Sequence, residues 1–115
     1  MTVQFKHFRN HIWDFDSGWN TDPRGGATVV SRAISDTQVE VAIALCSGKD
    51  GFNKTIGRNV ALGRLNKHPL VISVDDLNEM LDGNSVEHLV FWSDEGQRLL
   101  NHFGLEHVAY KAFRD

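Results

Sequence analysis

The sequence predicts one α+β domain over residues 1–115, with a mostly antiparallel sheet packed by a central basic helix and two shorter helices. Two β-rich segments separated by three residues indicate a hairpin. A segment with helical periodicity follows this hairpin, and five basic residues lie between Lys49 and Lys67. The last third of the chain holds two further segments with helix start and stop signals.

The composition is that of an ordinary globular domain. The chain has 115 residues, of which 41% are hydrophobic and 23% are charged, so it can bury a core without disulfides. Cys46 is the single cysteine, which excludes an intrachain disulfide and favours a reducing, cytoplasmic location. We expect no membrane association, because no apolar run resembles a signal peptide or approaches the length of a membrane span.

The net charge of −3 restricts the function classes. Proteins that coat nucleic acid are usually basic overall, and acidic mimics of DNA carry a much larger negative charge. The overall charge therefore favours neither class.

The first quarter of the chain predicts a strand followed by a long loop. Residues 3–13 alternate in polarity, which indicates an early strand. Residues 14–26 are rich in Gly, Asp, Asn and Pro, and loops of this length are often functional. Trp13, Phe15 and Trp19 lie in or beside this loop. Such aromatic residues either anchor a partner or stack on bases, or they fold back over the core, and the sequence leaves both interpretations open.

The hairpin is predicted over residues 27–34 and 38–46. In its second strand one face carries Val39, Val41, Ile43 and Leu45. The other face also becomes apolar toward its end, at Ala42, Ala44 and Cys46. A strand that is apolar on both faces is usually central in its sheet.

A helix is predicted over residues 50–66, with Ser47 or Asp50 as its N-cap. The residues expected to face the sheet recur at helical spacing and are Phe52, Ile56, Val60 and Gly63. The residues expected on the opposite side are Lys54, Arg58, Ala61 and Leu65, with Arg64 flanking them.

The last third predicts short elements in alternation. A buried strand over residues 70–74 precedes an acidic helix over 75–81. Residues 88–92 are consistent with a strand or a helix start, and Ser93 begins a helix that Gly104 closes. Residues 105–113 alternate in polarity and indicate a terminal strand.

The turn from Gly48 to Thr55 nearly fits the phosphate-binding loop G-x-x-x-x-G-K-[ST], except that Asn53 replaces the second glycine. That glycine lets the backbone wrap around a phosphate. A weaker hypothesis keeps an anion at the helix start beside Lys49 and Lys54, and the alternative is a solvated basic helix face.

The sequence predicts no catalytic residue, cofactor or metal ion. His7 and His11 share a face and could form a metal site with Asp14 or Asp16, but the other histidines are scattered and no cysteine pair supports such a site. Cys46 precedes a predicted helix start, which can lower a thiol pKa, yet a buried and inert thiol is the favoured interpretation. These features favour a protein that is not an enzyme.

Residues 49–65 resemble a segment of small bacteriophage and mobile-element proteins of unassigned function. That segment has Asp-x-Phe, then Ile-Gly-Arg, then Ala-x-Gly-Arg, which here correspond to Asp50–Phe52, Ile56–Arg58 and Ala61–Arg64. The resemblance covers about twenty residues. It implies a phage-type origin and no particular activity, and small phage proteins often act by binding host or defence machinery.

We therefore expect a phage-encoded binding protein of the anti-defence type that inhibits or modulates a host protein or nucleoprotein complex in the host cytoplasm. Trp19 is the expected aromatic anchor, and the expected charged contacts are Lys49, Lys54, Arg58 and Arg64. One alternative is an accessory protein that binds nucleic acid. Another is an enzyme or binder that acts on a phosphorylated small molecule through the turn at residues 48–55.

Overall fold

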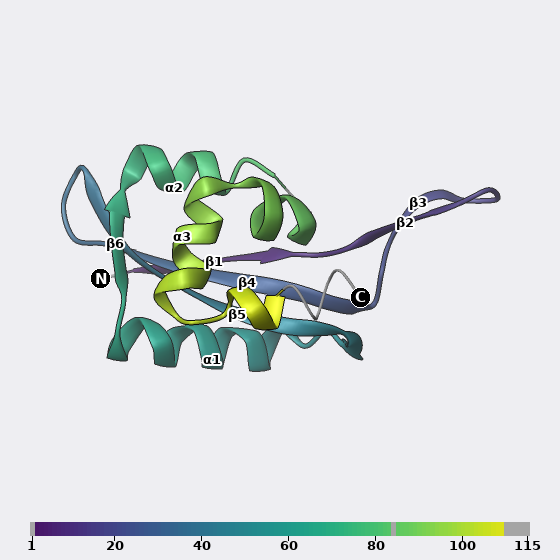
Figure 1. The fold of residues 1–115 in the computed structure, drawn as a ribbon, viewed down its shortest axis with the longest axis horizontal. Coiled ribbons are helices and arrows are strands. Elements are labelled where there is room, and N and C mark those ends of the chain that lie inside the picture. The colour runs from purple at the N-terminus through teal and green to yellow at the C-terminus, as the bar shows by residue number, and fades with distance from the viewer. Residues whose placement is uncertain (1, 84, 110–115) are drawn as a thin grey trace.

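The computed structural model describes residues 2–83 and 85–109, except for the side chains of residues 48 and 49. It confirms the predicted α+β class: an antiparallel sheet lies between helices (Figure 1). The elements in chain order are β1 (Val3–Phe8), β2 (His11–Asp14), β3 (Gly18–Thr21), β4 (Arg24–Ala33), β5 (Gln38–Gly51), α1 (Lys54–Lys67), β6 (Leu70–Ser73), α2 (Val74–Met80), the π-helical turn η1 (His88–Trp92) and α3 (Asp94–His102).

The main sheet has the order β1-β4-β5-β6, and each neighbouring pair is antiparallel. Strands β2 and β3 form a separate two-stranded sheet that projects from one end of the molecule (Figure 1). We call this hairpin, residues 11–21, the arm. With it the molecule is elongated, with extents of 47 × 24 × 22 Å.

Helices cover both faces of the sheet, so β5 contributes to two cores, as its pattern predicts. Val41 and Ile43 are fully buried on the face toward α2, η1 and α3. Ala42 and Ala44 pack on the other face against α1 (Figure 1). The central position predicted for this strand is therefore confirmed.

The predicted orientation of α1 is wrong. Ala61 and Leu65 are fully buried against the sheet, whereas Ile56 and Val60 are 61% and 40% exposed. The helix carries apolar residues on two sides, so periodicity alone could not select the packed face. Gly57 determines the packed face, because only a residue without a side chain can approach Thr28 so closely. A Cβ at position 57 would lie 2.5 Å from the Thr28 Oγ1.

The start of α1 also differs from the prediction. Strand β5 continues to Gly51, and the helix begins at Lys54 rather than at residue 50. Its N-cap is Asn53, whose side chain accepts a hydrogen bond from the Ile56 N–H at 3.0 Å. Neither Ser47 nor Asp50 serves as the cap, because the preceding strand still includes them.

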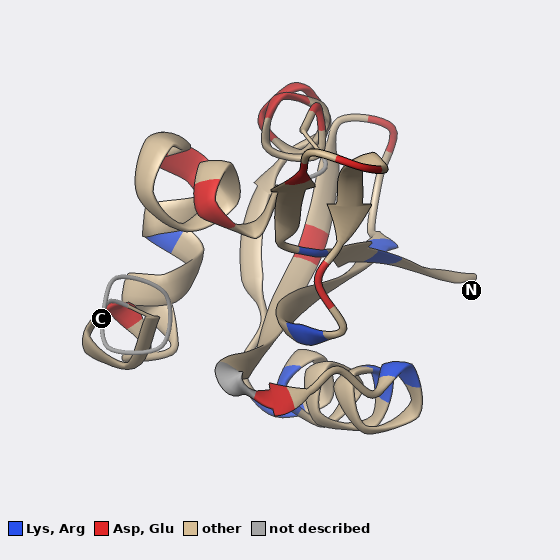
Figure 2. Cartoon of the chain, turned by 90° about the vertical axis from the view of Figure 1, so that its right-hand side faces the viewer, with Lys and Arg blue, Asp and Glu red and all other residues tan. Residues whose placement is uncertain are grey.

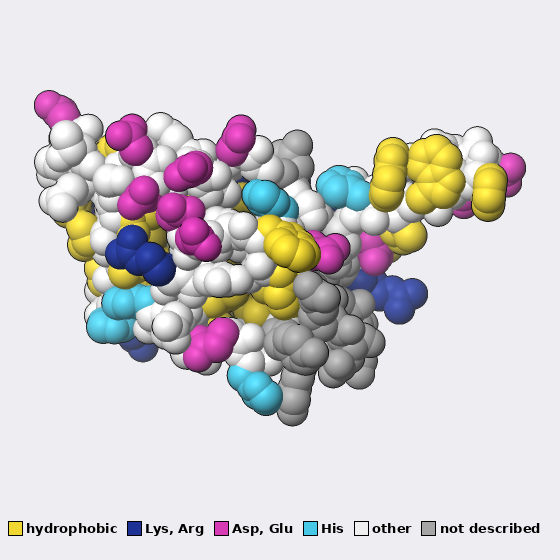
Figure 3. Space-filling view, turned by 45° about the horizontal axis from the view of Figure 1, so that its top comes forward, with side chains coloured by type: hydrophobic (Ala, Val, Ile, Leu, Met, Phe, Trp, Pro, Cys, Tyr) yellow, Lys and Arg dark blue, Asp and Glu magenta, His cyan; other side chains and the backbone are white. Residues whose placement is uncertain are grey.

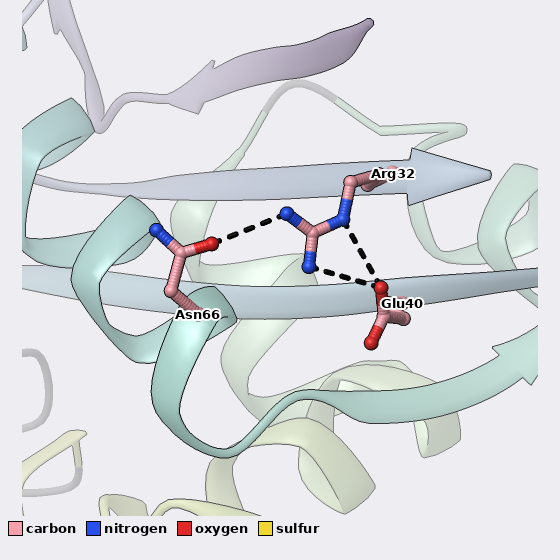
Figure 4. Close-up of polar contacts among 3 residues, drawn as sticks. All are labelled: Arg32, Glu40 and Asn66. Carbon is pink, nitrogen blue, oxygen red and sulfur yellow. Dashed lines mark hydrogen bonds and ion pairs between the residues drawn. The ribbon is translucent and has the colours of Figure 1, made fainter. Parts of the chain in front are cut away.

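Polar contacts hold the last turns of α1 against the sheet. Arg32 on β4 forms an ion pair with Glu40 on β5 at 3.0 Å (Figure 4). The same guanidinium donates a hydrogen bond to the Asn66 side chain on α1 at 3.1 Å (Figure 4). Arg64 donates another to the carbonyl oxygen of Ile43 at 2.8 Å. These contacts connect the helix to both central strands.

Two predictions for the first quarter are wrong. The single strand over residues 3–13 is divided into β1 and β2, and the long loop over 14–26 contains β3 and the start of β4. Gly18, with φ of 78°, adopts the left-handed conformation in the tight turn of the arm. The polar composition that indicated a loop therefore belongs to an exposed hairpin.

Most of the last third follows the prediction. Strand β6 forms at the expected position, but it lies at the edge of the sheet with Val71 41% exposed, so it is not the buried strand predicted. Helices α2 and α3 also form at the expected positions, and Ser93 caps α3 through a hydrogen bond from the Gly96 N–H at 3.0 Å. Residues 106–109 are helical, so the terminal strand predicted over 105–113 is wrong there, and residues 110–113 lie outside the described part. In the described ranges no helix is long and apolar enough to cross a membrane.

Candidate binding surfaces

The arm exposes a group of large apolar side chains. Trp13 on β2 is paired with Trp19 on β3, and their rings meet edge to face with centroids 5.5 Å apart. The exposed fractions in the arm are 51% for Ile12, 56% for Trp13, 98% for Phe15 and 69% for Trp19. Figure 3 shows hydrophobic side chains gathered on the projecting hairpin. Single exposed apolar residues are normal, but several large ones on one short projecting hairpin indicate an interaction site.

Local hydrogen bonds shape the arm, rather than packing on the core. At its tip the Asp16 N–H donates to the Asp14 carboxylate at 2.7 Å, and the Asn20 side chain donates to the Ser17 hydroxyl at 2.8 Å. At its root the Arg9 guanidinium donates to the carbonyl oxygen of Asp22 at 3.1 Å. The aromatic residues are thus held in position while remaining exposed.

A second surface lies near the root of the arm, where β1 and its C-terminal extension meet the start of α1. The Phe52 ring packs against both the Arg9 guanidinium, 4.4 Å from its centroid, and the His7 ring, 5.6 Å away. The Nδ1 atom of His7 is 2.8 Å from the Thr28 hydroxyl, which in turn faces Gly57 on α1. Contacts through Phe52 and Thr28 therefore connect β1 to the first turns of α1.

The positive charges of three side chains act on His7 at this place. Burial lowers the pKa of His7, and the positive charges of Lys54, Arg58 and Arg9 lower it further. No carboxylate contributes to this shift among the described residues. We call Arg9, Lys54 and Arg58, with His7 between them, the cationic cluster.

Charge is separated across the sheet. Helix α1 contains four basic residues and no acidic one, whereas α2 and α3 each begin with two acidic residues. Figure 2 shows basic residues along α1 and acidic residues on the helices of the opposite layer. The net charge of −3 therefore conceals one basic and one acidic face.

The five sequence-predicted binding residues do not form one site. Trp19 lies on the arm, whereas Lys54 and Arg58 are exposed in the cationic cluster. Arg64 is partly buried, with its pKa lowered by burial, and its hydrogen bond to Ile43 gives it a structural role. Lys49 belongs to β5, but its side chain lies outside the described residues.

The segment resembling a phosphate-binding loop has a different arrangement. Cys46 pairs with Gly26 and Gly51 pairs with Arg24, so residues 47–50 form a wide bulge in β5. The Asn53 side chain already accepts the N–H of Ile56 in the first turn of α1. A phosphate-binding loop requires free N–H groups at the helix start, and one of them is therefore already bonded to the Asn53 side chain.

Cys46 lies at the edge of a hollow of about 280 Å³ between β5 and α1. Ile56 and Val60 line this hollow as well. The pKa of the thiol is raised, chiefly by burial, instead of being lowered by the helix start. Its sulfur lies 3.5–3.7 Å from the backbone carbonyl oxygens of Ser47, Asp50 and Gly51. This thiol is a weak nucleophile at neutral pH.

Among the described residues, no cluster of potential metal ligands includes His7 or His11. The Nδ1 atom of His7 forms a hydrogen bond with the Thr28 hydroxyl. In the part of the chain that the structure describes, the carboxylates of Asp76, Glu79 and Glu95 lie within 4.8 Å of one another, and Arg98 approaches Asp76 at 3.9 Å.

Comparisons of the chain with protein-family models, with curated proteins and with solved structures found no match. Evidence for a function therefore comes from the two surfaces themselves. No pattern in the sequence indicated that His7, Arg9 and Ile12 contribute to these surfaces. His7 and Arg9 are brought toward α1 only by the register between β1 and β4, which pairs His7 with Thr28.

Proposed function

We propose that this protein acts by binding, and that the arm anchors it to a protein partner. Following the resemblance to phage proteins, that partner is a host protein or nucleoprotein complex that the chain inhibits or modulates, as an anti-defence protein does. The observation that carries the proposal is the exposed, paired Trp13 and Trp19 on a projecting hairpin, together with the exposed Phe15 in its turn.

The physical properties of the arm suit a binding anchor. Tryptophan is among the residues that most often dominate binding energy, because it buries a large area with few rotatable bonds. The edge-to-face contact between Trp13 and Trp19 further restricts both rings before a partner arrives. An isolated two-stranded hairpin is only marginally stable in water, so covering one face of the arm would also stabilise it.

The alternative function, binding of nucleic acid, is supported by a different observation. The cationic cluster offers three positive side chains on the basic face. The arm itself does not favour this alternative, since its tip carries Asp14 and Asp16, which repel phosphate groups.

The proposal is tested by affinity purification from host lysate with and without nuclease. The bait proteins are the wild type, the double variant Trp13→Ala/Trp19→Ala and the control Trp92→Ala. Trp92 is 68% exposed but lies on η1, away from the arm. We expect a protein partner that survives nuclease, is lost with the arm variant and is retained with the control. A partner that still binds the arm variant contradicts the proposal, and one that nuclease removes supports the alternative.

A further inference from the structure

We infer that the cationic cluster of Arg9, Lys54 and Arg58 around His7 is a binding site for phosphate groups. The site lies on a different surface from the aromatic face of the arm, and its test does not depend on the partner of the arm. Three features of the molecule support a phosphate site: tertiary contacts bring the cations toward one another, no cation of the cluster forms an ion pair among the described residues, and the sheet separates the cluster from the acidic face.

Tertiary contacts bring the segments that carry these side chains together. Arg9 and His7 both contact the Phe52 ring, at 4.4 and 5.6 Å. Thr28 connects His7 to Gly57, and the close approach at Gly57 requires a residue without a side chain. Lys54 and Arg58 flank Gly57 on the first turns of α1, spaced by one helical turn. The cations thus come from two separate parts of the chain, which the packed neighbours His7, Phe52 and Thr28 bring together.

Among the described residues, none of the three cations forms an ion pair with a carboxylate. Across the described ranges the ion pairs join Arg32 to Glu40 and Arg98 to Asp76, and neither pair involves the cluster. The Nε atom of Arg9 is buried and has no hydrogen-bond partner, although buried donors are almost always satisfied. Like charges gathered without a counterion raise the free energy of the folded state, and a bound anion would relieve that repulsion.

The acidic face does not cancel this positive field. It lies on α2 and α3, across the sheet from α1 (Figure 2). Layer spacings of about 10 Å place the two helix layers roughly 20 Å apart. Screening at physiological salt acts over about 8 Å, so the cluster presents a positive surface despite the net negative charge.

Phosphate is the anion that fits these groups best. The Arg58 guanidinium can bind two phosphate oxygens at once, and Lys54 adds a point charge one helical turn away. Lys54 and Arg58 are exposed rather than enclosed in a cavity, which suits the phosphates of a nucleic-acid backbone. Free phosphate compounds offer the same chemistry, so the experiment separates the two sources.

The test uses His7 as an internal reporter. The protein is labelled with ¹³C-histidine, and the pKa of His7 is measured by NMR alone, with a 20-base-pair DNA duplex and with inorganic pyrophosphate. Because neighbouring cations help to lower this pKa, a bound phosphate should raise it toward its ordinary value. Duplex binding is measured in parallel by fluorescence anisotropy at several salt concentrations.

For the wild type we expect a log–log salt slope of about −2 to −3, since each of three phosphate contacts contributes roughly −0.9. Lys54→Gln/Arg58→Gln should bring the slope to about −1 or shallower and abolish the rise in the His7 pKa. Lys67→Gln is the matched control, because Lys67 is a basic residue in the last turn of the same helix. It should leave the His7 response unchanged.

The outcomes distinguish a nucleic-acid backbone from a free phosphate compound, and they separate the proposal for the cationic cluster from the proposal for the arm. A response to the duplex assigns the site to a nucleic-acid backbone, and a response to pyrophosphate alone assigns it to a free phosphate compound. No response to either ligand overturns the inference, as does Lys67→Gln weakening binding as much as the double variant. The variant Trp13→Ala/Trp19→Ala should keep the phosphate response, so a failure of the arm proposal leaves this result intact.

Discussion

The arm and the hairpin of β4 and β5 are built alike but have opposite environments. Both are antiparallel and pair large apolar residues across their strands. In the β4–β5 hairpin Val29 and its partner Ile43 are 2% and 0% exposed, whereas in the arm Trp13 and Trp19 are more than half exposed. Helices cover β4 and β5 on both faces, whereas the arm projects beyond these helices (Figure 1). Strand pairing alone therefore does not form a hydrophobic core.

The two hairpins also differ in the kind of apolar residue. The buried one contains mainly small and β-branched residues, which pack tightly under helices. The arm contains tryptophan and phenylalanine, which offer large rigid surfaces to a partner. This division supports a structural role for one hairpin and a binding role for the other.

The largest difference should appear on removing an isoleucine from each hairpin. Ile43→Ala should lower the free energy of unfolding by about 2–5 kcal/mol, because it leaves a cavity in the core. Ile12→Ala in the arm is the matched control and should change it by about 0.5 kcal/mol or less, since Ile12 is 51% exposed. Urea denaturation measures both, and equal losses would show that the arm is packed.

A smaller effect is expected from adding one methyl group where α1 meets β4. Gly57→Ala should cost about 1–3 kcal/mol, because the new Cβ would crowd the fully buried Thr28 hydroxyl. Gly63→Ala in the same helix should instead stabilise by up to about 1 kcal/mol, since nothing lies near the new atom. Thermal unfolding should give shifts of opposite sign, and two shifts of the same sign would mean that α1 does not approach the sheet at Gly57.

A third expected effect concerns pH. The pKa of His7 is below its ordinary value of 6.5, so between the two values the unfolded chain binds more protons than the folded one. His7 should therefore favour folding above pH 6.5 and lower the stability as the pH falls below it. The loss of unfolding free energy between pH 7.5 and 5.5 should be smaller in His7→Gln, and an unchanged loss would contradict the lowered pKa.

The smallest effect on stability is expected from the arm itself. Trp13→Ala/Trp19→Ala removes an exposed ring contact worth about 0.5–1.5 kcal/mol within the hairpin. It should change global unfolding by less than about 1 kcal/mol, because no core residue depends on it. Calorimetry of this variant should match the wild type, and a large loss would give the arm a structural role in place of a binding one.

Local signals in the sequence were sufficient for most secondary structure. The apolar pattern on both faces of Val39–Leu45 placed β5 at the centre of the sheet, and Ser93 and Gly104 marked the ends of α3. The basic helix was also anticipated, within four residues at its start. These predictions succeed because periodicity and capping depend on residues only a few positions apart.

The tertiary structure alone decided which surfaces exist. Helix α1 has two apolar sides, and the approach of Gly57 to Thr28 determined that Leu65 is buried while Ile56 is exposed. The arm depends on where the helices end, and the cationic cluster joins His7 to Lys54 across 47 positions of sequence. No short-range pattern encodes such proximity, because it follows from strand register and from the packing of distant side chains.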